Sequence, residues 1–180
     1  MDALHDYIIP FVGLKLGKHT FTYHIDSKFF DYFQYDDFNV IDCEVTLSFD
    51  KKPRLFELSF DIKGFAMLRC DLSNEVFKEE IDTYLDLIVN FGDAYNNENE
   101  EVLILPHGEF QLNVAQYIYE AIVLALPVKR VHPGIEDGTL QSDVLDKLKE
   151  FEVKENKTTD PRWDKLNDLL TPKKHEDGTS

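Results

Sequence analysis

The residues best suited to contact a charged partner follow directly after a predicted helix. Lys129, Arg130 and His132 lie within four positions, between Pro127 and a Pro-Gly turn. Basic side chains of this kind bind phosphate or carboxylate groups. The same residues could instead interact favourably with the dipole at the helix C-terminus or pair with surface carboxylates. The residues alone leave both interpretations open.

No catalytic or metal-binding motif accompanies these basic residues. The sequence has no Gly-rich phosphate loop, no Gly-x-Ser-x-Gly elbow and no His/Glu pair at metalloprotease spacing. Asp31, Asp36 and Asp37 are close together, but their spacing matches no calcium loop and favours a solvated turn. Cys43 and Cys70 are too few for a disulfide framework or a zinc site. We therefore expect a protein without enzymatic activity and without a cofactor.

The charge of the chain is unevenly distributed. The formal net charge is −16, and residues 1–127 hold nine Lys/Arg against twenty-three Asp/Glu, a net of −14. Residues 128–180 hold ten against twelve, a net of −2. The first two-thirds should repel nucleic acid and suit a basic protein surface, and if the protein contacts RNA, the contacts are expected in the last third. We expect neither DNA nor a membrane as partner.

The helix before the basic residues is predicted from Asn113 to Leu126. Asn113 can cap it, and Gln116 three residues later suits a capping box. Apolar residues then recur at three- and four-residue steps. Val123 and Leu124 make the last turns apolar nearly all round, so we expect this helix end to be buried. Pro127 ends the helix.

Alternating apolar and polar residues predict a sheet ahead of this helix. Residues 41–49 give the clearest half-buried strand, and residues 56–62 should pair with it antiparallel across a Lys-Lys-Pro turn. Gly64 is expected to interrupt the second strand, with an extended run resuming at residues 65–70. Residues 93–101 are expected to form a mobile acidic loop. Further strands are expected at residues 12–16, 21–25, 81–91 and 102–105, the first two as a hairpin, with a short helix at 27–33.

These elements predict one α+β domain over residues 1–155. It has an antiparallel sheet of about six or seven strands, one main buried helix and short C-terminal helices. The sequence does not decide whether the sheet closes into a barrel. A C-terminal helix beginning Asp-Pro-Arg-Trp is expected in residues 156–172 and a disordered tail in 173–180. Trp163 either packs on the domain core or serves a partner.

The sequence indicates a cytoplasmic protein. It contains no apolar run of about 18 residues, so no membrane span is expected. Residues 1–10 lack the basic start of a signal peptide. The low cysteine content fits a reducing compartment.

Three segments together carry a resemblance to a known family. They are GFAMLRCD at residues 64–71, the stretch from Glu109 to Pro133 containing LALPVKRVHP, and DPRWDKLNDLL at residues 160–170. In this order and spacing they resemble the YceD-like family of large ribosomal RNA subunit accumulation proteins, over about residues 60–170. The commoner family pattern has Cys-x-Arg-Cys where this chain has Met67, Leu68, Arg69 and Cys70. It also has a metal-knuckle-like cysteine cluster after LALP, which is absent here.

The resemblance implies a non-catalytic factor in large ribosomal subunit biogenesis that binds a precursor particle through ribosomal RNA, ribosomal protein or both. The alternative is an acidic adaptor or chaperone for a basic ribosomal protein, with no RNA contact. The oligomeric state is left open. The candidate RNA- or partner-binding residues are Arg69, Lys129, Arg130, His132, Arg162, Trp163 and Lys165.

Overall fold

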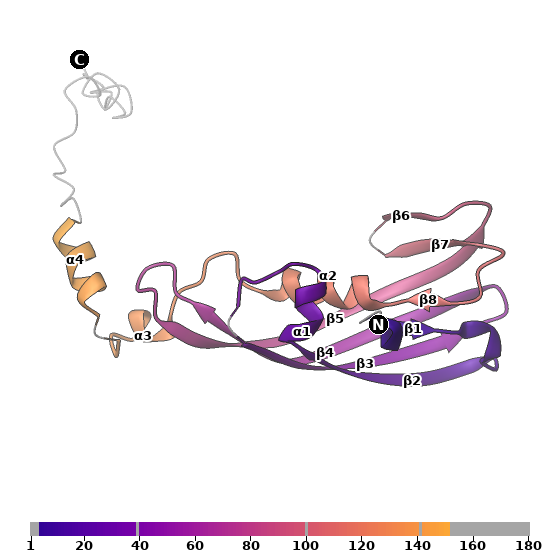
Figure 1. Cartoon of the computed structure of the whole chain (residues 1–180), viewed down its shortest axis with the longest axis horizontal. Helices are drawn as coiled ribbons and strands as arrows, with labels where there is room; N and C mark the ends of the chain where they lie inside the picture. The colour runs from indigo at the N-terminus through magenta and orange to yellow at the C-terminus, as the bar shows by residue number, and fades with distance from the viewer. Residues whose placement is uncertain (1–3, 39, 100, 141, 152–180) are drawn as a thin grey trace, which may run out of the picture. The chain divides into compact units, whose positions relative to one another are not determined.

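The computed structural model describes residues 4–38, 40–99, 101–140 and 142–151. It divides the chain into two compact units, residues 1–142 and residues 143–180. In the second unit the described element is α4 (Asp143–Phe151), one of the short C-terminal helices that the sequence predicts. The sheet, the main helix and the buried core all belong to the first unit (Figure 1).

A six-stranded sheet with the order β2-β3-β4-β5-β7-β6 forms the body of the first unit. All neighbouring strands are antiparallel except β5 and β7, which are parallel. The end strands β2 and β6 are not neighbours, so the sheet is open and not a closed barrel. The α+β class and the mainly antiparallel sheet are confirmed. The strand bounds are β2 (Gly17–Asp26), β3 (Val40–Lys51), β4 (Leu55–Arg69), β5 (Val76–Gly92), β6 (Asn96–Asn99) and β7 (Val102–Pro106).

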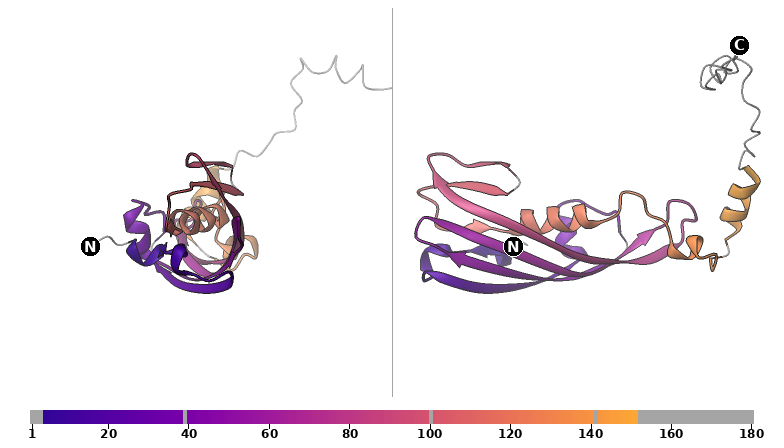
Figure 2. Two further views of the ribbon diagram at one scale, coloured as in Figure 1. Left: turned by 90° about the vertical axis from the view of Figure 1, so that its right-hand side faces the viewer. Right: turned by 180° about the vertical axis from the view of Figure 1, so that it is seen from behind.

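The sheet curls around the main helix α2 (Ala115–Ala125), which packs against β5 (Figures 1 and 2). Residues on the inner face, such as Val45, Leu47 and Ile62, are fully buried, as are Ile118 and Ile122 of the helix. The alternation of the strands produces this arrangement, because every second side chain points to the same face. A two-stranded sheet of β1 (Ile8–Ile9) and β8 (Leu112–Asn113) ties the N-terminal segment to the start of α2.

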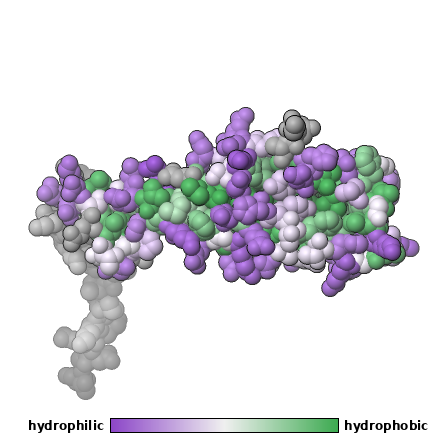
Figure 3. Space-filling model, turned by 60° about the horizontal axis from the view of Figure 1, so that its bottom comes forward, coloured by the Kyte–Doolittle hydropathy of each residue, from purple (hydrophilic) through white to green (hydrophobic). Residues whose placement is uncertain are grey.

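The outer face of the sheet is largely acidic. Lys63, Asp82 and Glu44 share one row across three strands, and Tyr84 in the neighbouring row is 80% exposed. Figure 3 shows polar side chains across most of this face, with apolar ones gathered nearer its ends. Carboxylates on this face account for part of the acidity of residues 1–127. They are Asp42, Glu44, Asp50, Glu57, Asp61, Glu80, Asp82 and Asp86.

The short helix α1 (Ser27–Tyr32) forms as predicted. The carboxylate of Asp26 accepts a hydrogen bond from the Lys28 backbone N–H at 3.0 Å and so caps the helix. Phe29 and Phe30 on the inner side of α1 are buried. This helix places an aromatic cluster beside α2, because Phe33 stacks on Tyr119 with 4.2 Å between the ring centroids.

Four local predictions were wrong. Residues 12–16 are not a strand, because Phe11–Gly13 forms a 3₁₀ helix and β2 pairs with β3 instead. Gly64 does not interrupt β4, which runs unbroken from Leu55 to Arg69. Residues 96–99, expected within a loop, form β6. The end of α2 is not buried on all sides, since Leu124 is 83% exposed; the sheet covers one side of the helix and leaves that residue uncovered.

Candidate functional site

The basic residues after α2 are fixed onto the turn between β4 and β5. We call this contact the junction and define it as residues 69–75 with residues 129–134. The Arg130 N–H donates to the Asp71 carboxylate at 2.8 Å, and the Asp71 N–H donates to the Arg130 carbonyl at 2.8 Å. The His132 N–H donates to the Cys70 sulfur at 3.3 Å. Two segments about sixty residues apart in sequence thus form one structural unit.

The Arg130 side chain reaches past the junction to a third segment. Its Nη2 lies 2.7 Å from Oδ2 of Asp37, and its Nη1 donates to the Asp37 carbonyl at 3.3 Å. The Arg130 side chain is 21% exposed. Its hydrogen bond lowers the pKa of the Asp37 carboxyl below the usual value. Of the two sequence interpretations, this geometry corresponds to pairing with a surface carboxylate.

Cys70 is the buried centre of the β4–β5 turn. Its sulfur accepts hydrogen bonds from the backbone N–H groups of Ser73 at 3.5 Å and His132 at 3.3 Å. Burial raises the pKa of this thiol, but the hydrogen bonds from Ser73 and His132 outweigh that effect, so the pKa is lowered overall. Asn74 adopts a φ of 61°, and its N–H donates to the Cys70 carbonyl at 2.9 Å. Cys70 therefore organises both halves of the junction.

His132 ends the basic segment and begins the short helix α3 (Pro133–Glu136). Its Nδ1 accepts a hydrogen bond from the Gly134 N–H at 2.9 Å and so caps that helix. The imidazole ring lies against Phe77, with 5.7 Å between the centroids. Because an accepting Nδ1 carries no proton, the neutral ring suits this contact.

The junction does not have the ligands of a structural zinc site. Such a site takes four Cys, His or carboxylate ligands. Here Cys70 is the one cysteine, and the Nδ1 of His132 already accepts a backbone N–H. Among the residues described, no group of three His, Cys, Asp or Glu side chains is placed to hold a metal ion.

Lys129 and Arg69 are the exposed cations of the junction. In the described part of the chain neither forms an ion pair. Arg69 ends β4 opposite Val76, so no carboxylate lies directly across the strand pair. Arg162, Trp163 and Lys165 lie outside the described residues.

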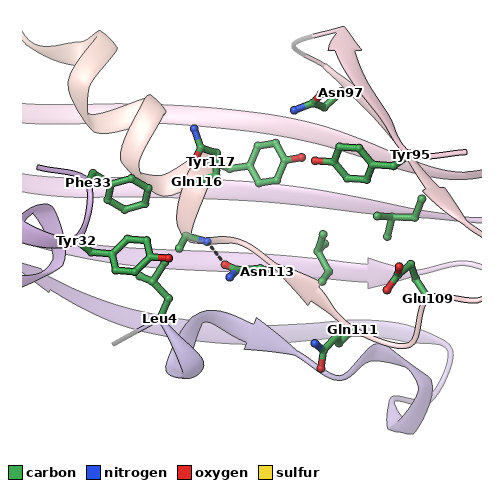
Figure 4. Close-up of a pocket in the computed structure, with 13 residues that line it drawn as sticks. Leu4, Tyr32, Phe33, Tyr95, Asn97, Glu109, Gln111, Asn113, Gln116 and Tyr117 are labelled. Atoms are coloured by element: carbon green, nitrogen blue, oxygen red, sulfur yellow. Dashed lines mark hydrogen bonds between the residues drawn. The ribbon is translucent and has the colours of Figure 1, made fainter. Parts of the chain in front are cut away.

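A groove of about 560 Å³ lies beside the start of α2 (Figure 4). Asn113 precedes α2, and its Oδ1 accepts a hydrogen bond from the Ala115 backbone N–H at 2.9 Å. The Gln116 side chain donates to Glu120 at 2.6 Å, so it does not complete the expected capping box. Sequence reasoning missed the groove, because it forms where β6, expected as loop, faces α2. Its lining residues are Leu4, Tyr32, Phe33, Tyr95, Asn97, Leu105, Glu109, Gln111, Leu112, Asn113, Ala115, Gln116 and Tyr117.

A comparison with protein families identifies the chain. The family described as large ribosomal RNA subunit accumulation protein YceD matches residues 58–170. The chain belongs to the YceD family. The match includes both segments that meet at the junction, Cys70 and Asp71 on one side and residues 129–134 on the other. No curated protein and no solved structure matched the chain.

Membership in the YceD family implies a role in the accumulation of large-subunit ribosomal RNA. No helix in residues 4–38, 40–99, 101–140 and 142–151 is both long and apolar enough to cross a membrane.

Proposed function

We propose that this protein is a non-catalytic factor that binds a precursor of the large ribosomal subunit in the cytoplasm. The observation that carries the proposal is the family match over residues 58–170. The junction supports it, because hydrogen bonds hold two of the matching segments together and leave two cations exposed beside them. Exposed Lys and Arg side chains on a fixed loop suit phosphate contacts.

Lys129 and Arg69 are the residues assigned to these contacts. Arg130 is already held by Asp37, so its removal would disturb the junction as well as any binding. Lys129 and Arg69 can be replaced without loss of a described ion pair. They therefore test binding separately from folding.

The test is sedimentation of the tagged protein in gradient-fractionated cell extract at low and at high salt. We expect co-migration with large-subunit precursors that salt disrupts. The double variant Lys129→Glu/Arg69→Glu should shift most of the protein to the light fractions. Lys18→Glu, at an exposed position on the outer face of β2, is the matched control and should sediment like the wild type. A wild-type protein found only as a light species under both conditions would overturn the proposal.

A second candidate function is favoured by the acidic outer face of the sheet. A protein with net −14 over residues 1–127 could act as an adaptor or chaperone that captures a basic ribosomal protein without touching RNA. This function predicts that a basic ribosomal protein stays bound to the purified protein after nuclease treatment. Loss of all bound protein on nuclease treatment would exclude it.

A further inference from the structure

The groove beside α2 has an aromatic wall that the core does not explain. Tyr32 and Tyr95 line it while remaining 57% and 56% exposed. The hydroxyl groups of Tyr95 and Tyr117 point toward one another across the groove (Figure 4). Phe33, directly after α1, completes the wall and is held by its stack on Tyr119. The fold thus positions the Phe33 ring before any ligand arrives and leaves the rings of Tyr32 and Tyr95 exposed.

Amide side chains add hydrogen-bonding groups to this wall. Asn97 on β6 and Gln111 before α2 line the groove, and neither side chain has a hydrogen-bond partner among the described residues. Both are exposed. A primary amide has two N–H donors and one carbonyl acceptor. Unused amides beside aromatic rings are suited to the backbone carbonyl groups of an extended peptide.

The charge around the groove determines whether it favours a cationic or an anionic ligand. Glu109 is the one charged residue in the lining, which contains no Lys, Arg or His. The segment from residue 93 to residue 128, which supplies most of the lining, has six Asp/Glu and no Lys or Arg. A nucleic acid backbone would find no counter-charge here. A cationic peptide is complementary to this field.

Aromatic rings with free hydrogen-bond donors are the features by which proteins recognise extended proline-containing segments. Such segments keep their carbonyl groups unpaired, and the prolyl rings pack flat on aromatic side chains. We propose that this groove binds a cationic, proline-containing extended segment of a partner protein. The inference rests on the proposed function only in placing that partner on the ribosomal precursor. The match between the groove lining and such a peptide does not depend on the proposed function.

The test is titration of the full chain with a fluorescently labelled twelve-residue peptide of alternating Pro and Lys, followed by anisotropy. Two further peptides serve as comparisons, one with Gly for Pro and one with Glu for Lys. A single-stranded RNA oligonucleotide is the fourth probe. We expect saturable binding of the Pro/Lys peptide at least tenfold tighter than that of any other probe.

Variants locate the bound peptide. Tyr95→Ala should weaken binding at least tenfold, since exposed aromatic anchors carry most of the energy of such contacts. Gln111→Ala should weaken it severalfold and is a second variant at a side chain without a described partner. Tyr84→Ala removes a tyrosine that is 80% exposed on the outer face of the sheet and should leave binding unchanged.

Three results would overturn the inference. They are no saturable binding, equal binding of the Gly/Lys peptide, and an equal loss of affinity in the Tyr84→Ala variant. Equal binding of the Gly/Lys peptide would mean attraction to net charge alone, and an equal loss in the Tyr84→Ala variant would mean that the peptide is not bound in the groove. The peptide titration fails or succeeds independently of the gradient experiment, so the failure of the groove and the failure of the proposed function are distinguishable.

Discussion

Arg130 and Lys129 are neighbours with the same charge but with different surroundings. The Arg130 guanidinium is mostly covered and holds both the carboxylate and the carbonyl of Asp37. Lys129 is exposed and has no ion pair in the described part of the chain. Two adjacent cations therefore have separable roles, one in holding the junction together and one available to a partner.

Replacing Arg130 with Ala is expected to destabilise the protein by about 1 kcal/mol at pH 7, a value reduced for the half-exposed Asp37 carboxylate. The pKa of Asp37 is lowered in the folded state, so its contribution is present above the unfolded pKa and is lost as the pH falls through the folded value. The stability difference between wild type and Arg130→Ala should thus shrink below about pH 4. Urea unfolding between pH 7 and pH 3 measures it.

The control for this experiment is Lys129→Ala. Its free energy of unfolding should stay within about 0.5 kcal/mol of the wild type at every pH. If the Arg130→Ala difference were the same at pH 7 and pH 3, the ion pair would not be the source of the stability.

The contacts of the junction could not be predicted from periodicity. Asp37 and Arg130 are 93 positions apart, and Asp71 and Arg130 are 59 apart. Hydrophobic patterns report which face of an element is buried, but they carry no information on which loops meet. The sequence did indicate the basic loop at residues 129–134 and the GFAMLRCD segment as important, yet their pairing is a consequence of the tertiary fold. The same limit applies to the groove, which is assembled from segments at residues 4, 32–33, 95–97 and 105–117.

At the scale of elements, alternation predicted the strands with one buried face. β3 and β4 bury every second side chain over most of their lengths, so the two-residue period of apolar side chains predicted these strands correctly. Residues 12–16 show a similar pattern without forming a strand. The Lys51 ammonium group donates to the carbonyls of Phe11 and Leu14, and these bonds fit a compact 3₁₀ segment. The parallel pairing of β5 with β7 also could not be predicted from the alternation of apolar and polar residues.

Gly64 was expected to break a strand but instead permits a close approach of two strands. It pairs with Cys43 in β3 and with Ile81 in β5. A Cβ at this position would collide with the Asp42 carbonyl and lie 2.6 Å from the Cα of Cys43. Because these are backbone atoms, the strands would have to separate for any larger residue.

Gly64→Ala is therefore expected to destabilise the protein by about 2–3 kcal/mol, as overpacking of a rigid core does. Urea unfolding followed by circular dichroism checks this value. Gly108→Ala is the control, since nothing lies within 4 Å of a Cβ added there, and it should change stability by less than about 1 kcal/mol. Equal effects of the two substitutions would show that the close approach at Gly64 is relieved at little cost.

At the scale of the whole molecule, the described core lies in the first unit, whereas Lys and Arg residues are most frequent in residues 143–180. Every member of the described hydrophobic core precedes Ser142, and the acidic outer face belongs to the same unit. Residues 143–180 contribute eight of the nineteen Lys and Arg residues, including Arg162 and Lys165. A chain that ends at Ser142 therefore keeps the core and the exposed cations Arg69 and Lys129 but loses the basic residues of the second unit.

A chain that ends at Ser142 is expected to unfold cooperatively, with a free energy of unfolding within about 1 kcal/mol of the full chain. Circular dichroism in urea measures this. A chain ending at Pro127 is the control, because it lacks Arg130 and the other contacts of the junction, and it should be clearly less stable. A chain ending at Ser142 that fails to fold would mean that residues 143–180 support the core. If it folds but no longer co-sediments with precursor particles, the contact requires residues 143–180. If it folds and still co-sediments, the exposed cations of the junction are sufficient.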